Sequence, residues 1–341
     1  MSNICAMVLT FNRKSLLKDC LEAIQRQTVR CDRVIVVDNG GTDGTFAMLQ
    51  NDYPWVESVR LRRNIGAAGG FAMGTRLAHA TGADRVWIMD DDVICEANAL
   101  EELCKGLDLL EGDGLQPPFI ISTAYSPQGP LTDVPDVCLT RDAVTGFPHW
   151  SDYLHMNLVA VTRATLASIL LPRRTLDRYG YPLASMFIWG EDAEYTFRIT
   201  KEQPGFVSGT SRVLHARTQL VLDLAAETSP ARIGWHRHLV KNHLYTARKH
   251  RTVAHVLWRL FLEGRRAAGL VAAGQPRKAL PILHGMAEGL WFRPPPADLS
   301  PDIDPALIES MNPALGSLPP TTGSAPACAP PSVSTKQGVA V

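Results

Sequence analysis

Three consecutive carboxylates, Asp90, Asp91 and Asp92, follow the apolar run 86–89. A short apolar run with polar flanks is typical of a buried strand in a parallel sheet, and ligands bind at the carboxyl edge of such sheets. Three neighbouring acids repel one another unless a cation lies among them. A divalent metal fits this need because hard cations prefer oxygen ligands. A solvated acidic turn is the alternative interpretation, and these residues alone leave both open.

Further polar residues are expected at the same edge, after two other predicted strands. Thr10 and Arg13 lie at the end of the predicted strand 3–11, and Asp38 follows the predicted strand 33–37. A nucleotide base could lie over these two strands, held by the three side chains, while its ribose and phosphates reach the aspartates. No GxGxxG pattern follows the first strand, which argues against a dinucleotide-binding fold.

The elements that must position these residues alternate between strand and helix. Short apolar runs predict strands, and apolar residues at helical spacing predict helices. The expected strands are 3–11, 33–37, 56–61 and 86–89, and the expected helices are 13–27, 42–49, 71–80 and 97–110. This alternation implies crossover connections and therefore an α/β fold with a doubly wound, mostly parallel sheet flanked by helices. The glycine-rich bend at 64–70 matches no phosphate-loop pattern, and close packing of helix on strand is the favoured explanation for its glycines.

The pattern changes after residue 110. Prolines punctuate the stretch 117–135, which favours strands and loops over helices. The elements expected beyond it are a strand at 158–161, a short helix at 165–171, a helix within 187–201 that begins near Asp192, and a strand at 205–214.

Charge is distributed unevenly, although the formal net charge of the 341 residues is +0. Residues 232–293 contain nine Arg and three Lys against two Glu, a net charge of +10, so the rest of the chain carries −10. Apolar spacing predicts helices here, broken at 274–276. This basic segment could contact an anionic membrane surface, pack on the preceding domain or build a homo-oligomer, and these uses stay open. It contains no recognisable nucleic-acid-binding motif.

Composition and cysteine usage are those of a globular intracellular protein, with 45% hydrophobic and 20% charged residues. The seven cysteines form no close pair, which predicts free thiols in a reducing cytoplasm. We see no basic leader before the first strand and no uncharged apolar stretch of about 18 residues. The expected location is therefore cytoplasmic, with peripheral contact at the inner face of the cytoplasmic membrane as an option.

Five motifs, in their order and spacing, resemble the inverting GT-A glycosyltransferases of family two: VLTFNR, VIVVDNGGTDGT, NIGAAGGFAMG, WIMDDDV and FIWGEDAEYTFR. The pairing of NIGAAGG with WGEDAEY is most similar to bacterial galactofuranosyltransferases, and rhamnosyltransferases share the general plan. The resemblance implies a Rossmann-like GT-A domain over 1–230. The basic helical segment 231–293 and a Pro-rich tail at 294–341, expected to be largely disordered, would follow it.

The resemblance also assigns roles by position. Asp90, Asp92 and His215 become ligands of Mn²⁺ or Mg²⁺, although a lone histidine more often has a structural role. Asp192 becomes the general base, with Glu191 beside it; alternatively, these acids only favour the start of a helix through its dipole. The implied acceptor-binding residues are Trp189 and Glu191, and the implied donor-binding residues are Thr10, Arg13, Asp38, Asn64, Gly69, Gly70 and Asp91. Galactofuranosyltransferases often carry two aspartates after the Trp, whereas this chain has Glu-Asp with an inserted glycine.

The implied reaction is a metal-dependent single displacement with inversion. The donor best suggested is UDP-galactofuranose, and the acceptor is a hydroxyl of a glycan or a polyprenyl-linked sugar, as in polysaccharide biosynthesis for the cell envelope. Two alternatives stay open: a rhamnosyltransferase that uses dTDP-rhamnose, and a catalytically silent scaffold that binds a sugar nucleotide. A silent scaffold is expected to lack the base, a metal acid or the histidine, and this chain has all of them.

Overall fold

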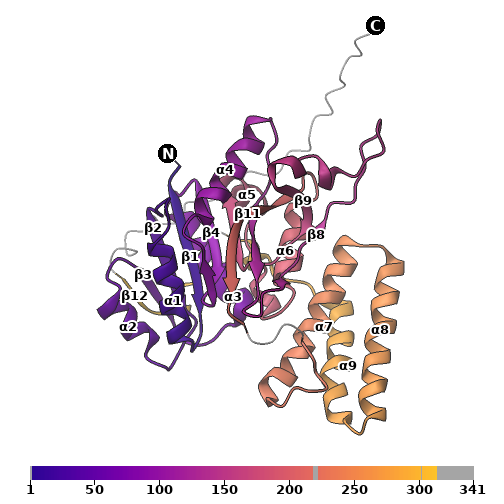
Figure 1. Ribbon diagram of the computed structural model, residues 1–341. Helices are drawn as coiled ribbons and strands as arrows, with labels where there is room; N and C mark the ends of the chain where they lie inside the picture. Colours follow the sequence, from indigo (N-terminus) through magenta and orange to yellow (C-terminus); the bar gives the residue numbers. More distant parts are fainter. Residues whose placement is uncertain (1, 218–221, 301, 313–341) are drawn as a thin grey trace.

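The computed structural model describes residues 2–217, 222–300 and 302–312. These residues contain a 12-stranded sheet with ten strands in one path, β12-β3-β2-β1-β4-β10-β6-β11-β9-β8, while β5 pairs with β11 and β7 with β6 (Figure 1). The strand bounds, in chain order, are β1 (Ile4–Thr10), β2 (Arg33–Asp38), β3 (Glu57–Leu61), β4 (Arg85–Asp90), β5 (Val93–Cys95), β6 (Ile120–Tyr125), β7 (Leu131–Thr132), β8 (Asp136–Val137), β9 (Leu158–Arg163), β10 (Ser168–Pro172), β11 (Gly205–His215) and β12 (Ile308–Met311).

Helices cover both faces of the sheet. Those on one face are α1 (Lys14–Gln25), α2 (Thr45–Asp52) and α4 (Ala99–Gly112), and those on the other are α3 (Gly66–Ala80), α5 (Arg173–Tyr179) and α6 (Glu191–Ile199). Strand β1 alternates between two cores: Ala6 and Val8 pack on the α1 side, and Met7 and Leu9 pack on the α3 side. Because both faces are covered, β1 reads as a continuous apolar run. The predicted α/β class is confirmed.

Parallel pairing is confined to part of the sheet. Strand β1 pairs in parallel with β2 and β4, and β2 pairs in parallel with β3. Beyond β4 the order is mixed, since β10 is antiparallel to both β4 and β6 while β11 is parallel to β6. The predicted helix at 165–171 is wrong, because Ser168–Pro172 is β10. Its apolar run is buried throughout, and periodicity alone cannot separate a short buried strand from a short helix.

Three helices lie between β11 and β12 in the chain: α7 (Pro230–His250), α8 (Val253–Ala272) and α9 (Pro276–Trp291). They have a small core of their own, which includes Val240, Leu270 and Ile282. A break that the sequence did not reveal separates α7 from α8 at Arg251–Thr252, where the Thr252 hydroxyl caps α8. Figure 1 shows this unit below the α6 side of the sheet. No described helix is both long and apolar enough to cross a bilayer.

The Pro-rich tail is ordered over its first part, so the prediction of disorder from residue 294 is wrong for the described residues up to 312. Pro296–Leu299 and Pro305–Leu307 form 3₁₀ turns, and β12 pairs antiparallel with β3 at the sheet edge. The Arg76 guanidinium binds the Ser300 carbonyl at 2.7 Å and also the Asp298 carbonyl. Composition underestimated the order because these contacts come from outside the tail. The expectation for 313–341 lies outside the described residues.

Close packing of α3 on β1 explains one glycine of the NIGAAGG bend. A Cβ added to Gly70 would lie 2.3 Å from Leu9 Cδ1 and 3.0 Å from Leu9 Cδ2. We therefore expect Gly70→Ala to lower the free energy of unfolding by about 1–3 kcal/mol, because the core must shift to admit the methyl group. Thermal melting measures this change. Gly112→Ala is the matched helical control, since nothing lies within 4 Å of its added Cβ. Equal melting temperatures for both variants would contradict the packing role.

Candidate active site

The carboxyl ends of β1, β2 and β4 meet at one edge of the sheet. Thr10 is the register partner of Asp38, and Leu9 is the register partner of Asp90. The antiparallel pairing of β5 with β11 sets Val93 beside His215. Residues far apart in the chain therefore reach this edge because backbone hydrogen bonds fix the register of the strands.

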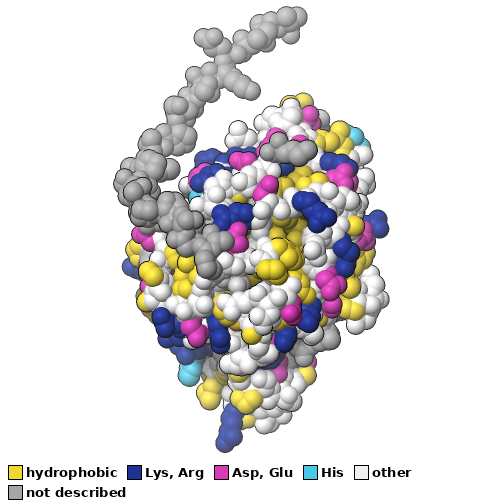
Figure 2. Space-filling view, turned by 90° about the vertical axis from the view of Figure 1, so that its left-hand side faces the viewer, with side chains coloured by type: hydrophobic (Ala, Val, Ile, Leu, Met, Phe, Trp, Pro, Cys, Tyr) yellow, Lys and Arg dark blue, Asp and Glu magenta, His cyan; other side chains and the backbone are white. Residues whose placement is uncertain are grey.

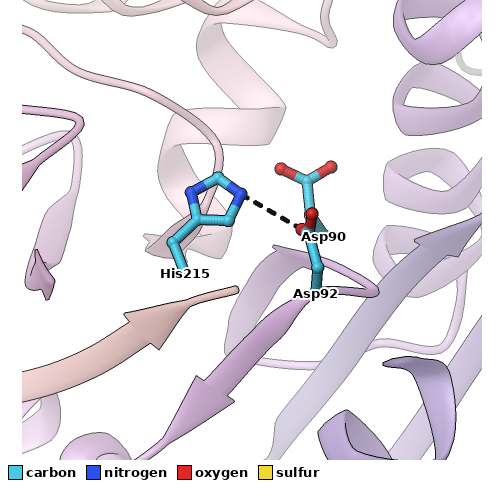
Figure 3. Close-up of side chains that lie close together, drawn as sticks. All are labelled: Asp90, Asp92 and His215. Carbon is cyan, nitrogen blue, oxygen red and sulfur yellow. Dashed lines mark ion pairs between the residues drawn. The ribbon is translucent and has the colours of Figure 1, made fainter. Parts of the chain in front are cut away.

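Asp90, Asp92 and His215 form a compact acidic cluster with one histidine, which we call the metal triad. Each offers one ligand atom, and the three atoms all lie within 4.8 Å of one another. Figure 3 shows the imidazole of His215, at the end of its strand, turned toward the two carboxylates. Its Nε2 lies 3.1 Å from Asp92 Oδ1, an ion pair with little exposure on either side.

The second nitrogen of His215 has a partner that sequence reasoning missed. His215 Nδ1 lies 2.7 Å from Asp133 Oδ2, and Arg217 Nη2 lies 2.9 Å from Asp133 Oδ1. Asp133 follows β7 with a positive φ of 53°. The contact with Asp133 fixes the imidazole so that Nε2 points at Asp92. Asp133 lies 82 residues from His215 in the Pro-punctuated region, so no local motif marks it.

Asp91 is not part of the triad, and its carboxylate binds Thr10 and Arg13. Its Oδ2 accepts a hydrogen bond of 2.7 Å from the Thr10 hydroxyl, and Arg13 Nη1 lies 3.2 Å from its Oδ1. The same Arg13 nitrogen lies 2.7 Å from Asp92 Oδ2. One guanidinium thus bridges two adjacent acids, which supplies part of the positive charge that they need.

Burial and the neighbouring charges shift the pKa values of all three residues of the metal triad. Desolvation, reinforced by Asp92, raises the pKa of Asp90 to about 7. Burial works against the charged form of Asp92, but the bond and charge of His215 outweigh it and lower the pKa of Asp92. The carboxylates of Asp133 and Asp92 overcome the burial of His215 and raise its pKa to about 10. His215 is therefore protonated at neutral pH and pairs with both acids, so a metal ion bound through Nε2 would have to displace that proton.

A second pair of acids lines the same cleft as the metal triad, and this cleft has a volume of about 1050 Å³. The cleft is lined by the triad, Arg13, Asp133, Arg163, Arg217 and the segment 188–193, among others. Glu191 and Asp192 form the first turn of α6, after Gly190 in the left-handed region. The structure thus brings the acids of the two sequence motifs into one cavity.

The two acids at the start of α6 differ in their hydrogen bonding. Asp192 Oδ1 accepts from the backbone N–H of Ala193 at 2.6 Å, as expected of an acid at a helix N-terminus. Glu191 Oε2 is buried and has no hydrogen-bond partner among the described residues. Burial, followed by the charge of Asp192, raises the pKa of Glu191 to about 8. Burial also raises the pKa of Asp192. Glu191 is therefore mostly protonated at neutral pH.

Four of the predicted donor-binding residues have structural partners at this edge. Asp38 Oδ1 accepts from the Gly41 N–H at 2.7 Å, and Asn64 Oδ1 accepts from the Gly66 N–H at 2.7 Å. Gly69 and Gly70 lie inside α3, where an added Cβ would meet Ile65 and Leu9 respectively. None of these four residues is among the described residues that line the cleft. Their role toward a donor stays a prediction.

Comparisons with known proteins agree with this architecture. The model of the family described as glycosyl transferase family 2 matches residues 5–130. The galactofuranosyltransferase GlfT1 of Mycolicibacterium smegmatis is 45% identical over 91 residues, which are 26% of this chain and 30% of that protein. GlfT1 of Mycobacterium tuberculosis is 41% identical over 92 residues, with the same shares. The chain thus aligns with less than a third of the length of these relatives.

A solved structure extends the likeness over more of the chain, at the level of the fold. The crystal structure of GalNAc-T7 with UDP, GalNAc and Mn²⁺ is similar with a TM-score of 0.53 and 12% identity, over 73% of this chain and 48% of that chain. That likeness shows the GT-A fold. The sequence matches add that residues 5–130 are similar to family 2 glycosyltransferases and that about a quarter of the chain is similar to the GlfT1 galactofuranosyltransferases.

Proposed function

We propose that this chain is a metal-dependent inverting glycosyltransferase that moves galactofuranose from UDP-galactofuranose to an acceptor hydroxyl. The observation that carries the proposal is that the metal triad and the acids Glu191 and Asp192 line the same cleft. One set suits the diphosphate end of a donor, and the other suits an attacking hydroxyl. The identity of the sugar rests on the similarity to GlfT1.

The donor set fits a divalent cation. Two carboxylates and one imidazole converge, and the buried Asp92 Oδ1 lies 3.1 Å from His215 Nε2. Such a set suits Mn²⁺ or Mg²⁺, with the histidine favouring Mn²⁺. The bound ion would neutralise charge that grows on the nucleoside diphosphate as it leaves. Asp90, Asp92 and His215 would hold it.

Asp192 is the proposed base. The acceptor oxygen attacks the anomeric carbon, its proton passes to the Asp192 carboxylate, and the electron pair of the broken bond leaves on the diphosphate. The attacking oxygen enters opposite the leaving group, so the configuration inverts without a covalent enzyme intermediate. Glu191, mostly neutral, can donate a hydrogen bond to the acceptor. Trp189 would provide an apolar wall for a sugar ring, with the Arg232 guanidinium 5.7 Å from its ring centroid.

Two alternatives must be distinguished from this proposal. One is a rhamnosyltransferase that uses dTDP-rhamnose, and the other is a catalytically silent scaffold that binds a sugar nucleotide. A screen of UDP-galactofuranose, UDP-hexopyranoses and dTDP-rhamnose with Mn²⁺ decides both, with release of the nucleoside diphosphate as the readout. Release from UDP-galactofuranose supports the proposal, and release from dTDP-rhamnose alone identifies the alternative sugar. Tight nucleotide binding without release or transfer to any glycan or polyprenyl-linked acceptor would indicate the scaffold.

We also propose that α8 and the end of α9 contact an anionic membrane, where a lipid-linked acceptor would lie. Helix α8 exposes Val253, Leu257, Trp258 and Phe261 by 56–76% of their surface, and Trp291 at the end of α9 is 81% exposed. The unit carries the net charge of +10 within 232–293. By contrast, the face that Figure 2 shows has basic and acidic side chains interspersed. Basic helices with an apolar aromatic stripe bind at the surface of anionic bilayers.

The base is tested by Asp192→Asn, which cannot accept a proton at neutral pH. We expect kcat to fall by about 10²-fold or more, with little change in donor affinity. Glu191→Gln is the matched neighbour and should lose less at pH 7, because the pKa of Glu191 is raised to about 8 and Gln imitates the neutral acid. Steady-state kinetics and melting curves measure both variants. Normal turnover in a folded Asp192→Asn enzyme would show that the base is another residue.

The contact between Asp133 and His215 is tested by metal affinity. Asp133→Asn removes the charge that orients the imidazole, so Mn²⁺ should bind about 10–100-fold more weakly. Electron paramagnetic resonance of free Mn²⁺ and calorimetry with UDP measure this without an activity assay. Asp92→Ala should abolish metal-dependent UDP binding altogether. Asp136→Asn is the control, because Asp136 pairs with Arg163 and not with the triad. An unchanged Mn²⁺ affinity in Asp133→Asn would contradict the orienting role.

Membrane contact is tested by co-sedimentation with liposomes. Wild-type protein should pellet with vesicles that contain anionic lipid, and less so as salt rises, because ions screen exposed charges. Arg265→Glu and Trp258→Ala should each weaken binding. Arg26→Glu, at an exposed arginine just after α1, is the charge-matched control. Binding that is absent, or that needs no anionic lipid, would leave packing or a homo-oligomer as the use of this face.

A further inference from the structure

The segment that leads into α6 has an unusual backbone. Phe187, Trp189 and Gly190 have φ values of 68°, 61° and 96°, so three of four consecutive residues have a positive φ. Bulky non-glycine residues rarely adopt this conformation, and they keep it only where the surrounding structure enforces it. This segment, 186–190, carries Glu191 and Asp192 into the cleft, and we call it the strained turn.

Asn242 on α7 makes the contacts that enforce the strained turn. The two hydrogens on its Nδ2 are shared among the carbonyl oxygens of Met186 at 2.9 Å, Ile188 at 3.1 Å and Trp189 at 2.8 Å. The side chain is fully buried, at 0% exposure. Rotating the amide by half a turn would set its oxygen against three carbonyl oxygens, so only this orientation is favourable. One side chain therefore fixes the three carbonyls that bracket both strained non-glycine residues.

Neighbouring contacts support the same turn from two sides. Lys241 Nζ donates to the Ser185 carbonyl at 3.0 Å, just before the turn. The carbonyl of Phe187 accepts from the Ala68 N–H at 3.0 Å, which ties the turn to α3. A Cβ at Gly190 would lie 3.3 Å from Asn242 Cβ. Gly190 is therefore required for two reasons: its φ is positive, and α7 approaches it closely.

We propose that Asn242 is a positioning residue for Asp192, and that α7 is therefore part of the active site. Asn242 touches no reacting atom; it holds the strained turn in the one arrangement that presents the acids to the acceptor. A displacement of about 1 Å at a base is enough to cost about 10²-fold in rate. The assignment of Asp192 as base rests on the proposed function, whereas the hold of Asn242 on the turn does not.

Two substitutions of Asn242 test the proposal, and they remove different numbers of hydrogen-bond donors. Asn242→Asp keeps the shape but removes both N–H donors and turns an oxygen toward the carbonyls. Asn242→Ser retains one donor. Thr246→Val is the matched control, because Thr246 lies one turn further along α7 and is also buried, at 7% exposure. Its hydroxyl has no hydrogen-bond partner among the described residues. Each full-length variant is measured by hydrogen exchange of the amides of 186–192, by a melting curve and by kinetics.

We expect exchange at 186–192 to rise by about tenfold or more in Asn242→Asp, with a smaller rise in Asn242→Ser and none in Thr246→Val. Transfer should lose about 10²-fold in kcat for Asn242→Asp and less for Asn242→Ser. The Kd for UDP with Mn²⁺ should change less than about twofold, because the triad lies on other elements. Unchanged exchange in a folded Asn242→Asp protein, or equal loss of kcat and UDP affinity, would overturn the proposal. If wild-type protein transfers no sugar, the proposed function fails, while the exchange data still decide whether Asn242 holds the turn.

Discussion

The repulsion among buried carboxylates at the end of β4 is the constraint on which the site depends. Asp90, Asp91 and Asp92 cannot all be charged in a dry environment unless cations approach them. Arg13 and His215 provide part of that charge from α1's start and from the end of β11. Arg13 and His215 lie beside the aspartates only because several strands pair in the observed register. The order of the sheet therefore determines the electrostatics of the site.

The proposed metal ligand and the proposed base are each held in place by a second set of residues. Asp133 holds His215, and Arg217 in turn holds Asp133. Asn242 holds the strained turn, which sets the start of α6 and thereby Asp192. Groups of this kind decide distances to fractions of an ångström, and proposed metal binding and proton transfer both depend on such distances.

The α/β architecture could be predicted from the sequence because strand β1 and its neighbours are buried on both faces and alternate with helices at regular intervals. The same reasoning failed at Ser168–Pro172, where a short apolar run fits either a strand or a helix. It also failed for the first part of the Pro-rich tail, since the hydrogen bonds that order residues 298–300 and 308–311 come from β3 and Arg76. Local patterns carry no information about partners that lie far away in the chain.

The sequence by itself determined the acid cluster, the Trp-Gly-Glu-Asp motif and the histidine after a late strand, because each is a short pattern at the end of a regular element. Only the tertiary structure decided which atoms meet. Asp133 reaches His215 across 82 residues, and Asn242 reaches Trp189 across 53. The physical reason is that hydrogen bonds and burial act through space. The sequence motifs predicted that Asp38 and Gly70 bind the donor. In the structure, Asp38 accepts a hydrogen bond from the Gly41 backbone amide, and Gly70 packs against Leu9.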